Sequence, residues 1–305
     1  MDRPPPDPPE PGPSETARPE TARSETVRPE TVRPETVRPE TARSPETARP
    51  RRNRDADWDA WPVDAYLAEN YRTLHPYDIG VIHHHAGVYR SFAPGSLART
   101  IELGAGPNLY PLMLAGAAAR RVDALEPSAA GVRYLRGQLT HGVDDSWLPF
   151  YRLCRSLDPA LPESCAEALR RVRVVRGTAD DLRPGTYDLA SMNFVAESVT
   201  EDFEEFTEVC DVFVHAVAPG GRLLAAFMEG MPSYRIGTGP VWPACPVDEA
   251  ALRAVFAPRT TGLRIVRLEK DRTLPEYGDT GMLLLTAERP GPAGTPAPQG
   301  DSSSR

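Results

Sequence analysis

Two features of the sequence have the residue types and spacing to hold a small ligand. The first is Gly104-Ala105-Gly106, which closes an apolar run, 99–103, and precedes a helix-forming stretch. Glycines at such a junction allow positive φ and a close approach of the backbone to a bound molecule, while free N–H groups at the helix start favour an electron-rich partner. The pattern predicts a strand that turns into the first helix of a doubly wound sheet, with a ligand bound at the turn.

The second feature, an acidic residue, indicates which ligand that is. Glu126 lies twenty positions after Gly106 and ends a second apolar run. A carboxylate at the end of the second strand is placed to accept the hydroxyls of an adenosine ribose. A dinucleotide fingerprint would have a third glycine where this chain has Leu109, so a pyrophosphate is disfavoured. The pair therefore favours S-adenosylmethionine (SAM), which has ribose and adenine but no phosphate. The alternative is a purely structural turn with a solvated Glu126.

The composition limits the class of protein. The chain has 305 residues and a formal net charge of −8, which argues against a nucleic-acid surface because such a surface needs a basic patch. No run approaches the ~20 apolar residues that span a bilayer, so we expect no membrane association. The four cysteines form no CxxC pair, and we expect a reducing, cytoplasmic location. Lys270 is the only lysine, and the abundance of Arg, Ala, Pro and Gly is typical of a high-GC bacterial genome.

Residues 1–56 are predicted to be a disordered, low-complexity arm. From Glu15 to Pro50 a unit of the type Glu-Thr-Val/Ala-Arg-Pro/Ser repeats seven times, with Pro45 inserted once. Frequent prolines remove N–H donors and block helix formation, and the unit has too few apolar groups to stack. The arm is either an extension without a partner or a segment that docks to another protein. One domain, 57–288, follows, and the Pro/Gly/Ser-rich tail, 289–305, is predicted to be disordered.

Two helices are predicted ahead of the first strand, where they could cover the mouth of the site. Asp64 can cap a short helix that runs to about residue 74, and a second helix begins at 76 or 77 and ends at 92. Tyr66 and Tyr71 are five positions apart and do not share a face of a regular helix. Both line one ligand only if the helix is bent or frayed at its end, and otherwise they pack on the sheet.

Three consecutive histidines, His83-His84-His85, lie in the second predicted helix. Consecutive helical residues point about 100° apart, so three in a row cannot converge on one metal ion. We expect no metal site, and we predict one buried and two solvated imidazoles.

The middle of the chain brings further polar residues to the same edge of the sheet. A helix, 128–139, is followed by an inserted helical stretch, 141–170, and by a third strand, 173–176. The loop after a third strand lies beside the adenine in a SAM fold, so Thr178 and Ala179 are candidates for that contact. Asp180 and Asp181 are interpreted as helix-start caps.

The fourth predicted strand, 187–194, ends at a second group of candidate residues. Ligands of open α/β sheets bind at the carboxyl ends of the strands, so we expect Asn193 and Glu197 to face the site. Glu197 is not needed as a helix cap, which leaves a functional and a structural role open. The rest of the sheet is predicted from a strand at 222–228, an irregular or hairpin segment at 229–245, a helix at 247–256 and strands near 263–268 and 282–287. Helix 200–218 has an apolar stripe of Phe203, Phe206, Cys210, Phe213 and Val217.

Residues 58–288 resemble the nicotinamide/phenylethanolamine/thioether-type methyltransferases and their bacterial relatives. The similarity rests on these motifs: Asp64-Ala65-Tyr66-Leu67-x-x-x-Tyr71, Glu102-Leu103-Gly104-Ala105-Gly106-Pro107-x-x-Tyr110, Glu126-x-Ser128, Phe194-Val195-Ala196-Glu197-Ser198-Val199-Thr200, and Pro219-Gly220-Gly221 leading to Tyr234-x-x-Gly237. The resemblance implies a class I (Rossmann-like) SAM-dependent methyltransferase with a mostly parallel seven-stranded sheet, helices on both faces and N-terminal covering helices.

The resemblance also implies roles for individual residues. Glu197 stands where amine-methylating members have a carboxylate beside the substrate nitrogen, which implies a catalytic role in accepting the amine proton. Tyr234 and Glu229 are placed at the substrate. The cofactor-binding residues implied by the turn and the resemblance are Tyr66, Tyr71, Gly104, Ala105, Gly106, Tyr110, Glu126, Gly131, Thr178, Ala179 and Asn193.

The chain departs from the family pattern in several places. Gly131 and Thr178 stand where family members often use Asn and Asp, the position of a second substrate acid falls on Met231, and the 141–170 stretch has no counterpart. The methyl acceptor is expected to be a small molecule, in the first place an amine, and transfer to oxygen, sulfur or carbon stays open. The alternatives from other classes are a non-catalytic SAM-fold scaffold and a nucleic-acid or protein methyltransferase.

Overall fold

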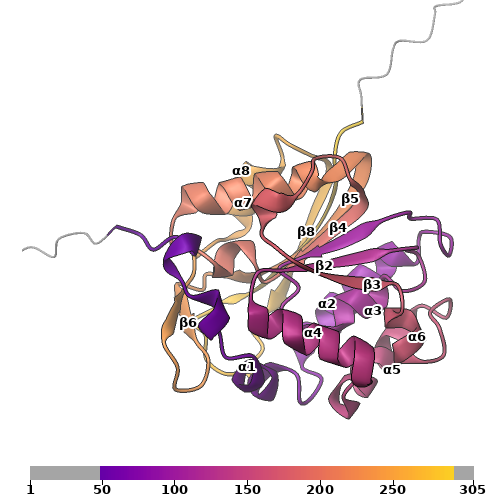
Figure 1. Cartoon of the computed structure of the whole chain (residues 1–305). Helices are drawn as coiled ribbons and strands as arrows, with labels where there is room; N and C mark the ends of the chain where they lie inside the picture. The colour runs from indigo at the N-terminus through magenta and orange to yellow at the C-terminus, as the bar shows by residue number, and fades with distance from the viewer. Residues whose placement is uncertain (1–48, 292–305) are drawn as a thin grey trace, which may run out of the picture. The chain divides into compact units, whose positions relative to one another are not determined.

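A seven-stranded sheet forms the centre of the structure, a computed structural model that describes residues 49–291 (Figure 1). The strand order is β3-β2-β1-β4-β5-β9-β8, in which only β9 pairs antiparallel with its neighbours. This confirms the predicted fold class. Most of the predicted arm, 1–48, and of the tail, 292–305, lies outside the described residues. The strands are β1 (Thr100–Leu103), β2 (Val122–Glu126), β3 (Val172–Arg176), β4 (Tyr187–Asn193), β5 (Val217–Glu229), β8 (Thr261–Glu269) and β9 (Gly281–Glu288).

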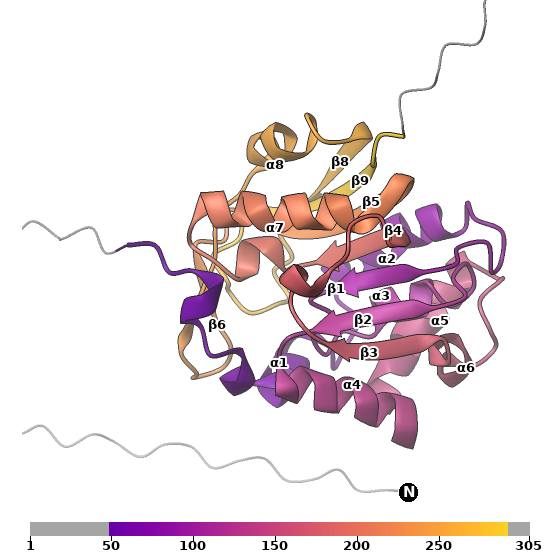
Figure 2. The same cartoon turned by 45° about the horizontal axis from the view of Figure 1, so that its top comes forward.

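The strand order reverses between β1 and β4, and helices cover both faces of the sheet. Every residue of β1 and β2 is buried, as expected for parallel strands covered on both sides. Figures 1 and 2 show α7 and α8 together on one side of the sheet and α4, α5 and α6 on the other. The helices that follow the strands are α3 (Tyr110–Leu114), α4 (Ala129–His141), α5 (Leu148–Leu157), α6 (Cys165–Leu169), α7 (Phe203–Ala216) and α8 (Glu249–Phe256).

The two predicted N-terminal helices are present as α1 (Val63–Asn70) and α2 (Pro76–Tyr89). Asp64 is not the cap of α1, because the helix begins one residue earlier, after Pro62. The helix ends before Tyr71, whose φ of −129° lies outside the helical range. That break supplies the frayed end that the spacing of the two tyrosines requires, and the hydroxyl oxygens of Tyr66 and Tyr71 are 3.3 Å apart.

The inserted stretch 141–170 is helical, as predicted, and forms α5 and α6 after a short turn at Asp145–Trp147. These helices pack on α2 and α3. They bring Trp147 and Phe150, both fully buried, against the ring of Tyr71, at centroid distances of 5.0 and 6.0 Å. The insertion therefore fixes the position of an aromatic side chain that the sequence placed in the site.

The apolar stripe of α7 is confirmed at its centre and corrected at its ends. Phe206, Cys210 and Phe213 are fully buried, but Phe203 in the first turn is 47% exposed. Val217 is buried as the first residue of β5, because the helix ends at Ala216.

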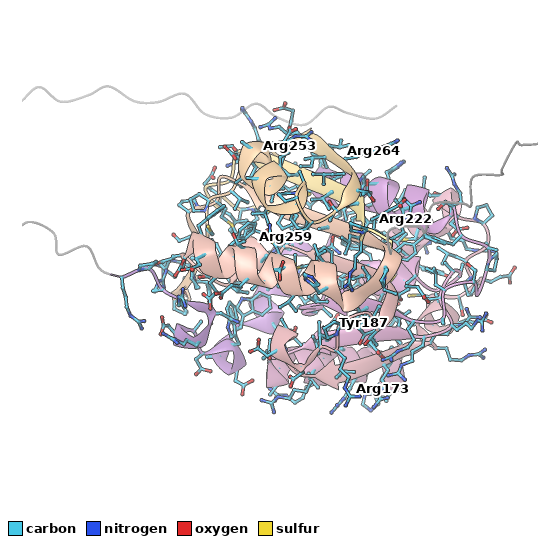
Figure 3. The ribbon with its side chains drawn as sticks, turned by 90° about the horizontal axis from the view of Figure 1, so that it is seen from above. Arg173, Tyr187, Arg222, Arg253, Arg259 and Arg264 are labelled. Atoms are coloured by element: carbon cyan, nitrogen blue, oxygen red, sulfur yellow. The ribbon has the colours of Figure 1, made fainter. Side chains whose placement is uncertain are left out.

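Charged side chains surround α7 and α8 on the outer side of the sheet. Figure 3 looks onto this side and labels Arg222, Arg253 and Arg259 among its arginines. These three form ion pairs with Glu288, Glu249 and Asp211, respectively.

The segment after β5 contains the predicted hairpin, formed by β6 (Ser233–Arg235) and β7 (Val241–Pro243). Residues 49–56, assigned to the arm from the sequence, instead pack against the domain. Arg51 and Arg52 pair with Glu201 and Asp202, just before α7. We call residues 49–61 the N-terminal strap.

The four cysteines are all buried and unpaired. Within the described residues, no helix combines the length and the apolar character that crossing a bilayer requires.

We predict that Phe206→Ala lowers the free energy of unfolding by about 3–5 kcal/mol, because it leaves a cavity between α7 and β5. The ring of Phe206 lies 6.2 Å from that of Phe227 and is fully buried. Phe203→Ala, on the exposed first turn of the same helix, is the matched control and should cost less than about 1.5 kcal/mol. Urea unfolding followed by circular dichroism measures both values, and equal losses would contradict the burial assigned to α7.

Candidate functional site

A cavity of about 540 Å³ lies at the carboxyl ends of β1, β2 and β4. Its volume falls within the roughly 300–1,000 Å³ of small-molecule sites, and its place is where open α/β sheets bind ligands. The glycine turn 104–106, Glu126, the loop 177–180 and residues 193–195 line it. The sequence-predicted turn, acid and loop are thus brought together around one space.

The glycine turn is built for close packing of two backbone segments. Gly104 and Gly106 have φ values of +58° and +52°. A Cβ on Gly104 would lie 2.7 Å from a methyl group of Val195, just after β4. Phe194 itself has a φ of +61°, a conformation that is strained for a bulky residue and concentrates at functional sites. The side chain of Val195, after β4, therefore occupies the space that a Cβ on Gly104, after β1, would need. Only glycine allows the two turns to lie this close together.

Glu126 joins the first two turns of the sheet. Its Oε2 accepts the amide of Gly106 and its Oε1 accepts the amide of Ser128, both at 2.8 Å. Burial raises the pKa of this carboxyl, and the two amides oppose that effect. Each oxygen keeps one lone pair, and the side chain lines the cavity, so the carboxylate can accept two further hydrogen bonds from a ligand.

Gly131 does not line either of the cavities described here, and its role is different from the predicted cofactor contact. A Cβ at this position would lie 2.8 Å from Oε1 of Glu126. The absence of a side chain at Gly131 leaves room for the carboxylate of Glu126.

Asn193 lines the cavity, but both ends of its side-chain amide form hydrogen bonds with buried side chains of the core. The Nδ2 group donates to Glu102 at 2.9 Å, so Oδ1 accepts from Nε2 of His85 at 3.0 Å. Burial lowers the pKa of His85 to about 3, which keeps it neutral, and raises the pKa of Glu102 to about 7. Ser191 also donates to Glu102. The network holds the end of β4. It could not be predicted from the sequence, because Glu102 lies within an otherwise apolar strand.

In the loop after β3, one polar residue caps the turn and others line the cavity. Asp181 accepts the amide of Thr178 at 2.8 Å and closes the turn. Thr178, Ala179 and Asp180 line the cavity. The first two were predicted there, whereas Asp180 was assigned to capping and instead faces the ligand space.

A smaller cavity of about 100 Å³ adjoins the first. Trp61, Tyr66, Phe194, Ser198 and Tyr234 line both, so the two spaces share a wall. Tyr66 and Tyr234 therefore lie between the two cavities.

Two further predicted tyrosines and one carboxylate do not line the larger cavity. Tyr71 lines the smaller cavity only. Tyr110 lines neither cavity: its ring stacks on Phe150 at 6.0 Å, and its buried hydroxyl has no partner among the described residues. Glu229 also lines neither, because it pairs with Arg267 at 2.8 Å.

Glu197 does not face the site as expected. It is 0% exposed and lines neither cavity. Its Oε1 accepts the amide of Met228 at 2.9 Å, and its Oε2 is buried without a partner among the described residues. Burial raises the pKa of Glu197 to about 8, so the protonated form predominates at neutral pH. The carboxyl lies behind Met228, whose side chain lines the smaller cavity.

The N-terminal strap forms part of the wall of the larger cavity. Asn53, Arg54, Ala56, Trp58 and Trp61 line it. The strap is held at one end by Nε of Arg51, 2.6 Å from Glu201, and further along by Asp59, which accepts the amide of Ala129 at 2.6 Å. Trp58 stacks on Trp242 of β7 with centroids 5.2 Å apart. The one sequence signal for this wall is the appearance of two tryptophans, Trp58 and Trp61, directly after the repeats.

The histidine run differs in part from the prediction of one buried and two solvated imidazoles, because only His83 is exposed. His85 is buried, His84 half-buried and His83 exposed, and Nδ1 of His84 lies 3.0 Å from Nδ1 of His85. Among residues 49–291, no group of three His, Cys, Asp or Glu side chains is arranged to hold a metal ion.

Comparisons with known proteins give likenesses only at the level of structure. No protein-family model matches the chain, and no curated protein matches it. The N-methyltransferase NodS from Bradyrhizobium japonicum WM9, in complex with S-adenosyl-L-homocysteine, is 16% identical, with a TM-score of 0.46 over 77% of this chain and 94% of that one. The DhpI-SAM-HEP complex is 18% identical, with a TM-score of 0.45 over 74% and 93%. The 1,6-didemethyltoxoflavin-N1-methyltransferase of Burkholderia thailandensis is 17% identical, with a TM-score of 0.43 over 74% and 81%.

Proposed function

We propose that this protein is a SAM-dependent methyltransferase that methylates a small molecule, with an amine nitrogen as the acceptor. The observation that carries the proposal is the position of Glu126. Its carboxylate is fixed by the amides of Gly106 and Ser128 and lines a cavity of about 540 Å³. A carboxylate held in this way at the end of the second strand is suited to the two hydroxyls of an adenosine ribose.

The residues around the cavity fit SAM better than a dinucleotide. Arg54 is the only cationic side chain among the described residues that line it, whereas Glu126, Asp180 and Glu205 supply carboxylates. A pyrophosphate would lack partners here, because the third glycine is absent and α3 has only five residues. A positively charged sulfonium compound has no such requirement, and the acidic wall suits its charge.

Different residues of the cavity wall are suited to contact the ribose and the adenine of SAM. Glu126 would bind the ribose, the 178–180 loop would lie at the adenine, and the N-terminal strap would cover it. When bound, SAM supplies a methyl group on a positively charged sulfur that a nucleophile can displace. The protein has little acid-base chemistry to perform in such a reaction, so its residues act mainly by orienting the acceptor and excluding water.

The smaller cavity is the space we assign to the acceptor, because it shares the wall of Tyr66, Phe194 and Tyr234 with the larger one. We assign Glu197 a positioning role behind this wall, since its carboxyl bonds to the amide of Met228 and does not reach the acceptor space. An oxygen, sulfur or carbon nucleophile would fit the same space, but the one carboxyl group in its wall, that of Asp78, favours an amine.

The proposal is tested with the purified full chain. Isothermal titration calorimetry should show binding of SAM and of S-adenosylhomocysteine, and no comparable binding of NAD. Incubation with SAM and a panel of small amines should release S-adenosylhomocysteine, measured by liquid chromatography. Tighter binding of NAD than of SAM would refute the proposal.

We predict that Gly106→Asp abolishes SAM binding in calorimetry. The new carboxylate would strain a backbone at φ +52° and fill the turn beside Glu126. Gly142→Asp is the matched control: its φ is +107°, nothing lies within 4 Å of its added Cβ, and it ends α4 away from both cavities. If both variants bind SAM as the wild type does, the site assignment is wrong.

We predict that Glu197→Gln changes how stability depends on pH. In the unfolded chain this carboxyl ionises near its ordinary pKa of 4.5, whereas the folded pKa is about 8. Between these values the unfolded chain binds fewer protons than the folded one, so the wild type loses stability as pH rises, and the loss ends above about pH 8. The variant lacks this loss, so its stability relative to the wild type should rise by roughly 2–4 kcal/mol from about pH 5 to about pH 8.

Urea unfolding at a series of pH values measures this difference. Glu163→Gln is the control, because Glu163 is 92% exposed and should give a nearly constant difference from the wild type. A constant difference for Glu197→Gln as well would show that Glu197 ionises normally in the folded protein.

A further inference from the structure

The smaller cavity is lined almost entirely by aromatic and aliphatic side chains. Tyrosines, tryptophan, phenylalanine and three methionines form most of its wall. Asp78 is the only ionisable carboxyl group among the described lining residues. The lining residues are Trp61, Tyr66, Asn70, Tyr71, Tyr77, Asp78, Phe194, Ser198, Met228, Met231, Tyr234, Ile236, Leu274, Tyr277 and Met282.

Asp78 lies in the first turn of α2 and is 6% exposed. Its Oδ2 accepts the amide of His75 at 3.3 Å, which caps the helix. The buried hydroxyl of Tyr110 lies beside the carboxyl group and lowers its pKa as a donor, against the larger effect of burial. Among the described residues, no Arg, Lys or His forms an ion pair with Asp78. Removing the charge of a carboxylate from water is costly unless the charge is paired. Asp78 shares the lack of a cation with Glu102, Glu126 and Glu197, and it is the one of these four that lines the smaller cavity.

Two tyrosines of the cavity wall are held by hydrogen bonds from their hydroxyls to carboxylates that do not line the cavity. The hydroxyl of Tyr77 donates to Asp279 at 2.7 Å, and the hydroxyl of Tyr277 donates to Glu69 at 3.1 Å. Tyr71 is packed against Trp147 of the insertion. With their hydroxyls engaged, these tyrosines present apolar ring surface to the cavity, and such surfaces also attract cations.

We propose that Asp78 binds the cationic nitrogen of the methyl acceptor, and that the acceptors are compact, largely apolar ammonium compounds. This inference rests on the proposed function and specifies its substrate class. The ammonium would supply the missing counter-charge to Asp78, while the aromatic and methionine side chains would enclose its apolar part.

Asp78 also offers a place for the proton that the ammonium loses before it attacks the methyl group. The N–H bond breaks, an O–H bond forms on the carboxylate, and both groups become neutral. Burial raises the pKa of Asp78 well above its ordinary value, which favours this transfer. Asp271 adds a further negative charge nearby.

The test compares an amine with its neutral isostere. Binding of benzylamine and of benzyl alcohol to the wild type is measured by calorimetry, with and without S-adenosylhomocysteine. We expect benzylamine to bind at least about tenfold more tightly, the value of one charge-assisted hydrogen bond. Asp78→Asn, which can still accept the His75 amide, should reduce this preference to about twofold or less and leave the affinity for benzyl alcohol and S-adenosylhomocysteine unchanged.

Asp248→Asn is the matched control. Asp248 caps α8 through the amide of Ala251 and lines neither cavity, so this variant should keep the preference for the amine. Cyclohexylamine and cyclohexanol provide a second pair on the wild type, which decides the question even if Asp78→Asn folds poorly.

The inference is overturned if the wild type binds each alcohol as tightly as its amine, or if a folded Asp78→Asn protein keeps the full preference. Failure of the wild type to bind S-adenosylhomocysteine would instead reject the proposed function. The amine and alcohol titrations without that compound still report on Asp78, so the two failures are distinguishable.

Discussion

The bond of one carboxylate to two backbone amides is the constraint on which the site depends. Glu126 holds the amide of Gly106 after β1 and the amide of Ser128 after β2, and so fixes the relative position of two turns. A buried carboxylate needs these donors, because unpaired it would be costly to remove from water. Gly131 leaves the space that the carboxylate occupies. The same contact therefore stabilises the edge of the sheet and presents the remaining lone pairs to the ligand.

The two cavities are kept adjacent by elements that come from distant parts of the chain. α1 supplies Tyr66, the turn after β4 supplies Phe194, and the β6–β7 hairpin supplies Tyr234. Behind this shared wall, the 141–170 insertion packs Trp147 and Phe150 against Tyr71. The insertion thereby holds in place an aromatic ring that lines the smaller cavity.

The fold and the residues that line the larger cavity could be predicted in part from the sequence, because local patterns determine them. The glycine turn, the apolar strands and the spacing to Glu126 are all short-range signals, and the structure combines them as expected. Side-chain direction could not be predicted. The carboxyl of Glu197 accepts the amide of Met228 in β5, and the side-chain amide of Asn193 donates to Glu102. Both bonds form because buried polar groups need hydrogen-bond partners, and these partners come together only in the folded sheet. Asp78 was missed since nothing in its sequence surroundings distinguishes it from an ordinary helix-capping residue.

The N-terminal strap has a consequence for the order in which the protein is made. Arg51 is joined to Glu201, 150 positions later, and Asp59 to Ala129, 70 positions later. During synthesis on the ribosome the strap emerges before either partner exists. In the nascent chain this segment, with Trp58 and Trp61, therefore lacks its partners until α4 and then α7 have left the exit tunnel. Both tryptophans, half-buried in the folded protein, are open to solvent until then. The N-terminal strap therefore completes the wall of the larger cavity late in co-translational folding, after the turns that it covers are in place.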